Sequence, residues 1–489
     1  MIAAHRTQVL VIGSGAGGAV TALTLAEAGF DVTVLEEGNR PGRESYGRSD
    51  TEAMKTFYRH SGMTPIMGRV PIGFVEGACV GGSTEINSGF WHRTPREVLL
   101  RWKAQFGLAD ASADELREHF AWAERLLEVG LYGRPWPAST RLFARGAEAM
   151  GWAAQEVPRV APGCAGLNAC ARGCPSGAKR GMATSLIPRA EAAGARILPH
   201  CRAQLLLRRK HRIYGVLAEL RCEDGTRELV RIEADEVFVC AGPTQTPALL
   251  RRSGIKFHVG ETLRIHPMLK VVAHCDGEPL DAHKSVIPLL QVKEFWPEIS
   301  LGGAYFTPGH AALMLSDNWR ELGDRMQDVR HLAGYYVAVK GTGRGSVRPA
   351  QLDDDTTFVR YDLSDEDVRN LSRGLARLAT LLLAAGATAV FPCVSGLPPI
   401  RTEIEAVRWL DELLPLSTLS LTTVHAFSSC PIGERLVSCA ANSFGKIHSL
   451  TNLYVNDASM LPDSPGVNPQ GSVMALARRN ALHFIAQHS

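Results

Sequence analysis

The chain has 489 residues, a mass of 53.0 kDa and a formal net charge of +3. Hydrophobic residues make up 45% and charged residues 21%, close to the averages for soluble globular proteins, which excludes wholesale disorder and collagen-like repeats. A balanced charge offers no electrostatic footprint for a polyanion, so we expect no nucleic-acid partner.

We also expect no targeting segment and no membrane span. The residues ahead of Val9 leave no room for the basic region, apolar stretch and cleavage site of a signal peptide. The most apolar long stretch, ATLLLAAGATAV from Ala379, is shorter than the ~18 residues that cross a bilayer. The 11 cysteines, an odd number, show no framework of a disulfide-stapled secreted fold. These features favour a cytoplasmic protein, and they leave its oligomeric state open.

The first 40 residues predict a β-α-β unit. QVLVIG reads as a short strand, the glycine-rich GSGAGGAVTALTLAEAG as a turn that opens a helix, and DVTVLEEG as a second strand. The turn matches the pattern G-x-G-x-x-G at the place where a pyrophosphate would meet the N-terminus of the helix. The residues of this turn that we assign to the cofactor are Gly13, Gly15, Ala16, Gly17 and Gly18.

The residues of this unit have different expected roles in binding a dinucleotide. Gly13 allows the tight turn, Gly15 lets the backbone approach a pyrophosphate, and Gly18 allows close packing of helix on strand. Glu36, at the end of the second strand, is placed to accept the hydroxyls of an adenosine ribose. The unit therefore predicts dinucleotide binding, without distinguishing FAD from NAD.

The remaining elements follow in chain order. Residues 41–75 carry several Gly and Pro and read as loops, and 96–150 read as helical. A loop rich in Cys, Gly and Pro covers 158–181, before a helix and a strand over 185–209. DEVFVCAG, at 235–242, reads as a buried strand with a helix directly behind it. Residues 268–345 look like antiparallel strands with long connections, and 365–386 form an amphipathic helix with an acidic first turn.

Several motifs in one order resemble the glucose-methanol-choline (GMC) oxidoreductases. They are GACVGGSTEINSGF, EVFVCAGPTQTPALLRRSGI, TLRIHP and NLYVNDASMLPDSPGVNPQGSVMALARRN. The last is most similar to the cholesterol-oxidase-like and long-chain-alcohol-oxidase-like branches. Recognisable motifs run from Val9 to Asn480 and are thin only from about 280 to 340. Such an ordered set is far more specific than any single glycine motif.

The resemblance implies an α+β fold with a Rossmann-like FAD lobe and a substrate lobe built on an antiparallel sheet. On this basis 1–100, 160–267 and 425–489 form a discontinuous FAD-binding domain. Residues 101–159 would be a helical connection and 268–424 the substrate-binding domain. Some relatives attach FAD through a histidine in the glycine-rich stretch, which here reads GGSTEIN, so we expect non-covalent FAD.

By position, the resemblance implies further contacts to FAD. Gly81, Gly82 and Asn87 would lie along the isoalloxazine and pyrophosphate, and Asp457 near the phosphates and ribityl chain. Backbone N–H groups of glycines can approach a flat ring that side chains would block. Each of these glycines could instead belong to an ordinary turn. The other positions assigned to the cofactor are Ala203 and Gln204 near the adenine, and Ala241, Gly242 and Asn468.

The resemblance places the chemistry at HAFSSCPIGE and at GVNP. His425 matches the catalytic histidine and would take the hydroxyl proton of an alcohol while a hydride leaves the same carbon for flavin N5. Asn468 would orient the substrate oxygen by an N–H donor. Ser428 and Ile432 replace the usual glycine and methionine of the motif, which leaves the shape of this loop open. We expect His266 to be structural and His92 and His448 to be solvated or packed.

Two features near these motifs allow several interpretations. Cys164, Cys170 and Cys174 could ligate an iron-sulfur cluster or zinc, form a disulfide, or remain free thiols in a loop that covers the flavin. We expect no metal, because no usual cluster spacing is matched. Glu85 could meet a cationic substrate such as an amino sugar, although bonding to backbone in the turn is favoured, and we expect Lys179 to be solvated.

We therefore expect an FAD-dependent enzyme that oxidises an alcohol to a carbonyl, with oxygen or another electron acceptor. The substrate could be a sugar or amino sugar, or a lipophilic alcohol. The arginine-rich, lysine-poor basic set is typical of a high-GC bacterial genome. Two rivals are a non-redox lyase on the same fold, similar to hydroxynitrile lyases, and a flavin-binding electron-transfer module. The second has no need of a residue such as His425.

Overall fold

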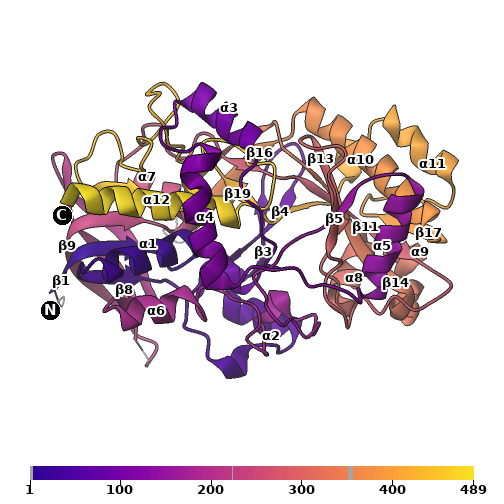
Figure 1. Ribbon diagram of the computed structural model, residues 1–489, viewed down its shortest axis with the longest axis horizontal. Helices are drawn as coiled ribbons and strands as arrows, with labels where there is room; N and C mark the ends of the chain where they lie inside the picture. The colour runs from indigo at the N-terminus through magenta and orange to yellow at the C-terminus, as the bar shows by residue number, and fades with distance from the viewer. Residues whose placement is uncertain (1–3, 223, 351–355, 489) are drawn as a thin grey trace.

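The computed structural model of the protein describes residues 4–222, 224–350 and 356–488. Within these residues the strands form two large sheets, of seven and nine strands, at opposite ends of an elongated molecule (Figure 1). The expected α+β class and two-lobed architecture are confirmed. The strands are β1 (Ala4–Ile12), β2 (Val32–Leu35), β3 (Tyr58–Ile66), β4 (Ile72–Gly77), β5 (Ala154–Glu156), β6 (Arg196–Leu198), β7 (Cys201–Arg209), β8 (Arg212–Arg221), β9 (Arg227–Val239), β10 (Arg264–Ile265), β11 (Met268–His274), β12 (Leu290–Val292), β13 (Ile299–Gly303), β14 (Leu332–Val339), β15 (Arg344–Pro349), β16 (Thr357–Asp362), β17 (Ala389–Pro392), β18 (Leu421–Thr423), β19 (Ala426–Phe427) and β20 (Leu453–Val455).

The helices lie around both sheets and between them. They are α1 (Ala16–Glu27), α2 (Asp50–Phe57), α3 (Arg96–Phe106), α4 (Ala113–Leu127), α5 (Ala138–Ala149), α6 (Leu186–Ala192), α7 (Gly242–Arg252), α8 (Pro308–Leu315), α9 (Trp319–Leu322), α10 (Asp365–Ala384), α11 (Glu403–Val407) and α12 (Gln470–His488). Short 3-10 turns join several of them, including one over Gly82–Glu85. No helix in the described parts of the chain is long and apolar enough to cross a bilayer.

The first sheet has the strand order β6-β2-β1-β9-β8-β7, and β20 also pairs with β9. β1 runs parallel to β2. In the same sheet β9 and β20 run parallel to each other, and β8 is antiparallel to both of its neighbours. The parallel strands are buried on both faces, which explains the continuous apolar runs in their sequences. The predicted β-α-β unit is therefore the centre of this sheet.

Distant segments of the chain complete this lobe. Helix α12 lies alongside α1 on one face of the sheet, as the yellow and indigo ribbons show (Figure 1). Asn456, directly after β20, donates from its amide to Thr21 on α1 and to a carbonyl of α12. A shared apolar core joins both ends of the chain, from Val9 to Phe484.

The second sheet has the order β3-β4-β18-β11-β14-β13-β12-β5, with β17 also paired to β11. Helix α10 packs on it, and Ser364 and Asp367 form a capping box at the N-terminus of that helix. The antiparallel strands expected over 268–345 are present as β11 to β14, interrupted by α8 and α9.

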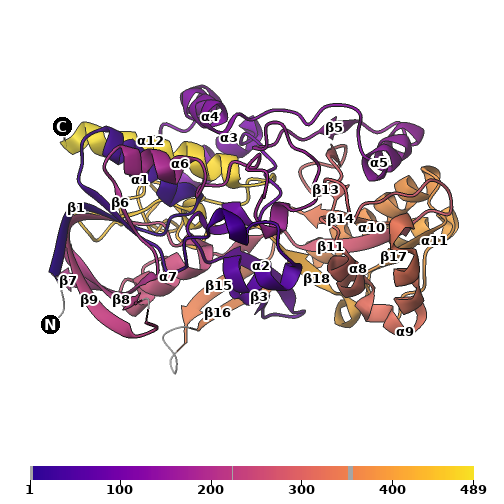
Figure 2. The same ribbon diagram turned by 90° about the horizontal axis from the view of Figure 1, so that it is seen from below.

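The prediction of loops over 41–75 is wrong, because this segment holds α2, β3 and part of β4. β3 has intermediate or exposed side chains at most of its positions, so its sequence lacks the apolar alternation that marks a strand. β4 pairs with β18 and thereby joins the second sheet, although the sequence places 1–100 in the FAD-binding domain. β5, within the expected helical connection, also belongs to the second sheet. Figure 2 shows β3 and the β15–β16 hairpin between the two lobes.

Candidate active site

The glycine turn between β1 and α1 has one open glycine among crowded ones. A Cβ atom on Gly13, Gly17 or Gly18 would lie 2.3, 2.0 and 1.9 Å from backbone oxygen atoms of neighbouring segments. A Cβ atom on Gly15 would meet nothing within 4 Å. Gly15 is also the residue that caps α1, whose first N–H groups point out of the helix. The turn thus combines tight packing with an open approach at the helix N-terminus, as a pyrophosphate requires.

Glu36 lies at the carboxyl end of β2, 5% exposed, with its carboxylate aimed at the same turn. It accepts hydrogen bonds from the backbone N–H of Ser14 (3.1 Å), from its hydroxyl (2.6 Å) and from the N–H of Gly38 (3.0 Å). Burial, and then the neighbouring Glu37 charge, raise the pKa of Glu36 to about 7. Each carboxylate oxygen has two lone-pair sites, so Glu36 can still accept a sugar hydroxyl at Oε1, which has one protein donor.

The second glycine-rich stretch lies directly on the first. Gly81 donates its N–H to the hydroxyl of Ser14 (3.0 Å), and a Cβ atom on Gly82 would lie 3.1 Å from Cα of Gly15. Both glycines have positive φ angles, 95° and 56°, which favour glycine. Asn87 turns away from this junction, because its amide donates to Gln470 at the start of α12 (2.7 Å).

Asp457 supports the neighbouring turn at the start of α7. Its carboxylate accepts hydrogen bonds from the N–H of Gly242 (2.8 Å), the hydroxyl of Thr246 (2.5 Å) and the N–H of Ser459 (2.7 Å). Burial raises the pKa of Asp457. Because protein donors occupy both of its oxygens, Asp457 holds the Ala241–Gly242 turn in place beside the glycine turn of β1.

The residues present fit FAD. Gly15 and Gly242 each have open space where a Cβ atom would stand, and the side-chain oxygen of Gln204, on β7, is buried without a hydrogen-bond partner in the protein. Ala203 lies beside Gln204 on the same strand. An adenosine ribose at Glu36, a pyrophosphate at Gly15 and an adenine near Gln204 would satisfy the groups that the protein leaves open.

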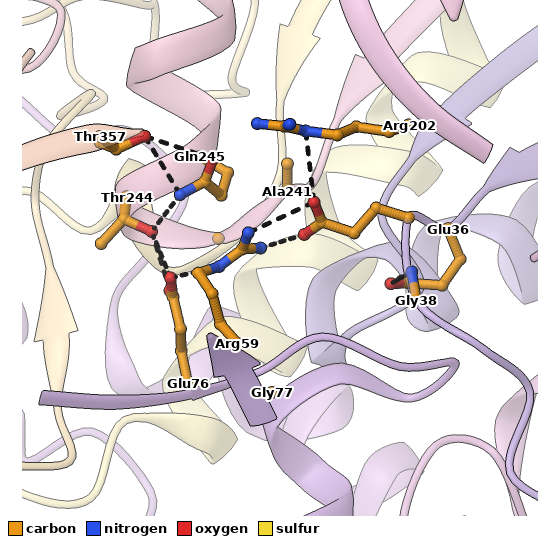
Figure 3. A network of polar contacts seen from close by, with 12 residues as sticks. Glu36, Gly38, Arg59, Glu76, Gly77, Arg202, Ala241, Thr244, Gln245 and Thr357 are labelled. Atoms are coloured by element: carbon orange, nitrogen blue, oxygen red, sulfur yellow. Dashed lines mark hydrogen bonds and ion pairs between the residues drawn. The ribbon is translucent and has the colours of Figure 1, made fainter. Parts of the chain in front are cut away.

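A buried ion network lies next to these residues (Figure 3). The guanidinium of Arg59, on β3, contacts the carboxylate of Glu37 and that of Glu76 on β4 (Nε to Oε1, 2.6 Å). Arg202 also reaches Glu37 (3.5 Å), and Thr244 on α7 donates to Glu76 (2.8 Å). Burial opposes the charge of Glu37, but the Arg59 cation lowers its pKa. The network joins β2, β3, β4 and α7, and sequence reasoning did not identify it.

His425 and Asn468 meet between the two lobes. The amide Nδ2 of Asn468 lies 3.1 Å from Nε2 of His425, and both side chains line one pocket. His425 lies between β18 and β19, and Asn468 lies two residues ahead of α12. Burial, and then the charge of Lys293, lower the pKa of His425 to about 3, so its imidazole is neutral near pH 7. The two residues are therefore placed to share one substrate oxygen.

His266 fixes the orientation of His425. Its Nδ1 lies 3.1 Å from Nδ1 of His425, and its Nε2 lies 2.8 Å from the hydroxyl of Ser464. If Nε2 of His425 accepts the amide N–H of Asn468, then its Nδ1 carries the proton and donates to His266. This arrangement agrees with the expected structural role of His266, because it favours the tautomer of His425 in which Nε2 carries no proton.

The pocket is narrow, with a cavity volume of about 20 Å³. Strands β12, β13 and β14 form one wall, where Gln291 donates to the hydroxyl of Tyr336 (2.7 Å). Gln291 also approaches Asn468 (Nε2 to Oδ1, 3.5 Å). His92 is half-buried nearby, which agrees with the packed alternative of its prediction, and burial lowers its pKa to about 3. Gly466 and Val467 belong to the GVNP motif, where the resemblance placed the chemistry. The pocket-lining residues that sequence reasoning missed are Met268, Gln291, Lys293, Pro297, Ser300, Tyr336, Ala338, Val339 and Lys340.

The three thiols of the 158–181 loop contact neighbouring side chains of the protein. Among the described residues, no cluster of three His, Cys, Asp or Glu could hold a metal ion, and each of the 11 cysteines is free. Instead, the buried guanidinium of Arg159 contacts Cys164 (3.5 Å) and Cys170 (3.1 Å). Cys174 lies 3.2 Å from the hydroxyl of Ser176.

Lys179 and Glu85 both have structural partners. Lys179 is buried, which corrects the expectation of a solvated lysine, and its ammonium donates to the carbonyls of Glu85 (2.6 Å), Cys170 (2.7 Å) and Asn87 (3.1 Å). The carboxylate of Glu85 accepts from the N–H of Ala183 (3.1 Å) and the hydroxyl of Tyr46 (3.1 Å). Glu85 does not line the pocket, so the favoured interpretation of a turn-bonded carboxylate agrees with the geometry, and an amine-binding role has no support.

Family models match most of the chain. A model of the N-terminal domain of GMC oxidoreductases matches residues 9–268, and one of the C-terminal domain matches 341–477. A GMC-type oxidoreductase, y4nJ, of Sinorhizobium fredii is 40% identical over 98% of this chain and 95% of its own length. A long-chain-alcohol oxidase of Arabidopsis thaliana is 27% identical over 97% of this chain and 68% of its own.

Solved structures share the fold at low sequence identity. Pyridoxine 4-oxidase from Mesorbium loti superposes with a TM-score of 0.71 at 16% identity, with 99% of both chains covered. A formate oxidase gives a TM-score of 0.70, also at 16% identity and 99% coverage of both chains. This likeness concerns the fold alone.

Proposed function

Because the chain belongs to the GMC oxidoreductase family, we propose that it oxidises an alcohol to a carbonyl compound with His425 as the base. The family makes the protein an oxidoreductase with FAD as its cofactor, and no histidine of the GGSTEIN stretch is available for covalent attachment. Bound FAD supplies a two-electron acceptor for the hydride that leaves the alcohol carbon. The pair of His425 and Asn468 at the pocket carries this proposal.

The residues of the site divide the remaining work. Nε2 of His425 accepts the hydroxyl proton, and the amide of Asn468 donates to the same oxygen and stabilises its developing negative charge. His266 keeps Nδ1 of His425 protonated, so that Nε2 remains the accepting atom. The depressed pKa of His425 keeps it unprotonated before the substrate arrives. Oxygen or another acceptor would then take the electrons from the reduced protein.

A single-turnover experiment tests the assignment of His425. We expect the His425→Ala variant to purify yellow and loaded with FAD, but to be reduced by alcohols about 100-fold or more slowly in anaerobic stopped flow. His211→Ala, which changes an exposed histidine, is the matched control and should be reduced at the wild-type rate. Wild-type kinetics in His425→Ala would contradict the proposal.

The same experiment separates the rival functions. A lyase or an electron-transfer module would retain its yellow colour when alcohols are added without air, whereas an alcohol-oxidising enzyme would bleach. Re-oxidation of the bleached protein by air and by dyes then identifies the electron acceptor.

A further inference from the structure

The pocket that holds His425 and Asn468 is cationic. Its lining includes Lys293 and Lys340 but neither Asp nor Glu. Both lysines are half-buried. This is unusual for a site whose substrate would be a neutral alcohol, because a lysine removed from water usually has a partner that compensates its charge. The two lysines therefore indicate that the pocket could bind an anion.

The sheet register shows that one lysine faces the reacting groups. Gln291 and Tyr336 lie in one row across β12, β13 and β14, where Gly302 between them leaves room for both side chains. Two positions further along, Ser300 on β13 pairs with Ala338 on β14. Lys293 is the residue that follows β12, and it extends the same row. Side chains two positions apart share one face of a sheet. Lys293 thus belongs to the same face as the residues that contact Asn468.

The ammonium of Lys293 has only a neutral partner. It donates to the hydroxyl of Ser300 (3.0 Å), and within residues 4–222, 224–350 and 356–488 no carboxylate forms an ion pair with it. Burial lowers its pKa to about 8, so most of it is charged at pH 7. Lys340 differs, because Asp463 and Glu298 lie close enough to favour its charge. Lys293 is therefore the cation in this pocket that still lacks an anion.

The position of Lys293 also affects the base. Its charge lowers the pKa of His425, after the larger effect of burial, and it opposes protonation of His266 and His92 as well. A cation beside a base hinders proton uptake. An anion that pairs with Lys293 would remove this repulsion at the moment when His425 receives a proton. Binding and proton transfer would then both favour an anionic substrate.

We propose that the substrate of this enzyme is an alcohol that also carries a carboxylate, which the ammonium of Lys293 and the hydroxyl of Ser300 bind. This inference rests on the proposed alcohol oxidation and names its substrate class. It departs from the sequence-based expectation of an uncharged or amine-bearing substrate. A single ammonium beside a hydroxyl suits a carboxylate better than a phosphate dianion, which proteins usually hold with several donors.

Substrates of matched shape test the proposal in the FAD-loaded full-length protein. We would compare 6-hydroxyhexanoate, its methyl ester, hexan-1-ol and 6-aminohexan-1-ol by the rate of anaerobic flavin reduction. We expect kcat/KM for the carboxylate to exceed that for the ester about tenfold or more, with the amine slowest. Equal or higher kcat/KM for the ester or the amine would overturn the proposal and leave alcohol oxidation intact.

Variants connect this preference to Lys293. In Lys293→Met the ratio of kcat/KM between the carboxylate and its ester should fall to about one, and Lys293→Arg should keep most of the preference. Lys284→Met, an exposed lysine in the same lobe, is the control and should keep the wild-type ratio. A ratio that survives in Lys293→Met would show that another group selects the anion and would overturn the assignment.

A binding experiment separates this inference from the proposed function. Hexanoate has no hydroxyl, so its binding to the oxidised holoprotein, followed by flavin difference spectra, needs no turnover. We expect its Kd to rise about tenfold in Lys293→Met, and to rise in the wild type as the pH passes about 8. His92, His266 and His425 are neutral there and Tyr336, with its pKa raised to about 12, stays protonated, so the lysines are the groups that titrate. Binding without flavin reduction by any alcohol would contradict alcohol oxidation alone, whereas no binding would overturn the anion site.

Discussion

Ser428 carries an unfavourable backbone conformation at a position where the sequence left the shape of the loop open. It stands where related motifs have glycine, its φ is 63°, and its buried hydroxyl lacks a hydrogen-bond partner in the protein. A side chain in the left-handed region costs about 1 kcal/mol, and an unpaired buried hydroxyl adds to that cost. We therefore expect Ser428→Gly to raise the free energy of unfolding by about 1 kcal/mol. This net value already subtracts the destabilising effect of the conformational entropy that glycine adds to the unfolded chain.

Thermal unfolding of the holoprotein measures this change. Ser429→Gly is the neighbouring control, because Ser429 donates to the carbonyl of Pro243 (2.7 Å) and its φ is not in the left-handed region. That variant should lose stability. A lower melting temperature in Ser428→Gly would mean that the serine hydroxyl has a partner in solution.

The depressed pKa of His425 predicts the pH dependence of the reaction. A base must be unprotonated, and burial together with Lys293 moves the pKa of His425 to about 3, below its ordinary value of about 6.5. We expect kcat/KM for a neutral alcohol to stay constant as the pH falls through about 6.5 and to decline only as the pH approaches about 3. Anaerobic stopped flow across pH measures this profile. A decline centred near 6.5 would show that His425 titrates like an exposed histidine.

At the scale of elements, Arg59 joins strands that the sequence separates. Its guanidinium is buried and lies between two carboxylates, the half-buried Glu37 after β2 and the buried Glu76 on β4. Removing one partner of a buried ion pair leaves uncompensated charge, at a cost of about 3–5 kcal/mol. Arg59→Met should therefore lower the stability of the protein by that amount and reduce its FAD content, because Glu36 and α7 adjoin the network.

Denaturant unfolding and the ratio of flavin to protein absorbance measure both effects. Arg69→Met removes an exposed ion pair with Asp365 and is the control, for which we expect a change of less than about 1 kcal/mol. An equal loss in both variants would contradict the special role of the buried network.

Elements differ in how well their sequences predict them. The β-α-β unit and α10 can be predicted from sequence because the features that specify them are local. These features are the apolar spacing, the turn at Gly13 and the capping box at Ser364. β3 is not, since its sequence has no alternation and its strand state comes from pairing with β4. His425 and Asn468 came from motif resemblance. Lys293 could not be predicted as a site residue, because only the register of β12 and β13 brings it to the pocket.

At the scale of the whole molecule, bound FAD should stabilise the fold by contacting elements that are far apart in the sequence. The groups that fit it come from β1, β2, β7 and α7, and from the turn at Gly81. A ligand that binds the folded state alone adds about 2.7 kcal/mol of stability at 100 times its Kd. We expect the apoprotein to melt at a lower temperature and to regain stability with FAD, and less with riboflavin, which lacks the adenosine and pyrophosphate that Glu36 and Gly15 would bind.

Differential scanning fluorimetry of apoprotein and reconstituted protein tests this expectation. Glu36→Gln should weaken the stabilisation by FAD and leave that by riboflavin unchanged, because only FAD carries the ribose. Equal stabilisation by both ligands in the wild type would contradict the placement of the adenosine at Glu36.

The interleaved order of the first sheet has a consequence for biosynthesis. β20 and α12 complete the lobe around β9 and α1, yet they follow the entire second sheet along the chain. A ribosome adds residues one at a time, so the early β-α-β unit emerges long before the segments that enclose it. During synthesis, one apolar face of the β-α-β unit therefore stays uncovered until β20 and α12 emerge. The protein can enclose the flavin only after the second lobe has been synthesised.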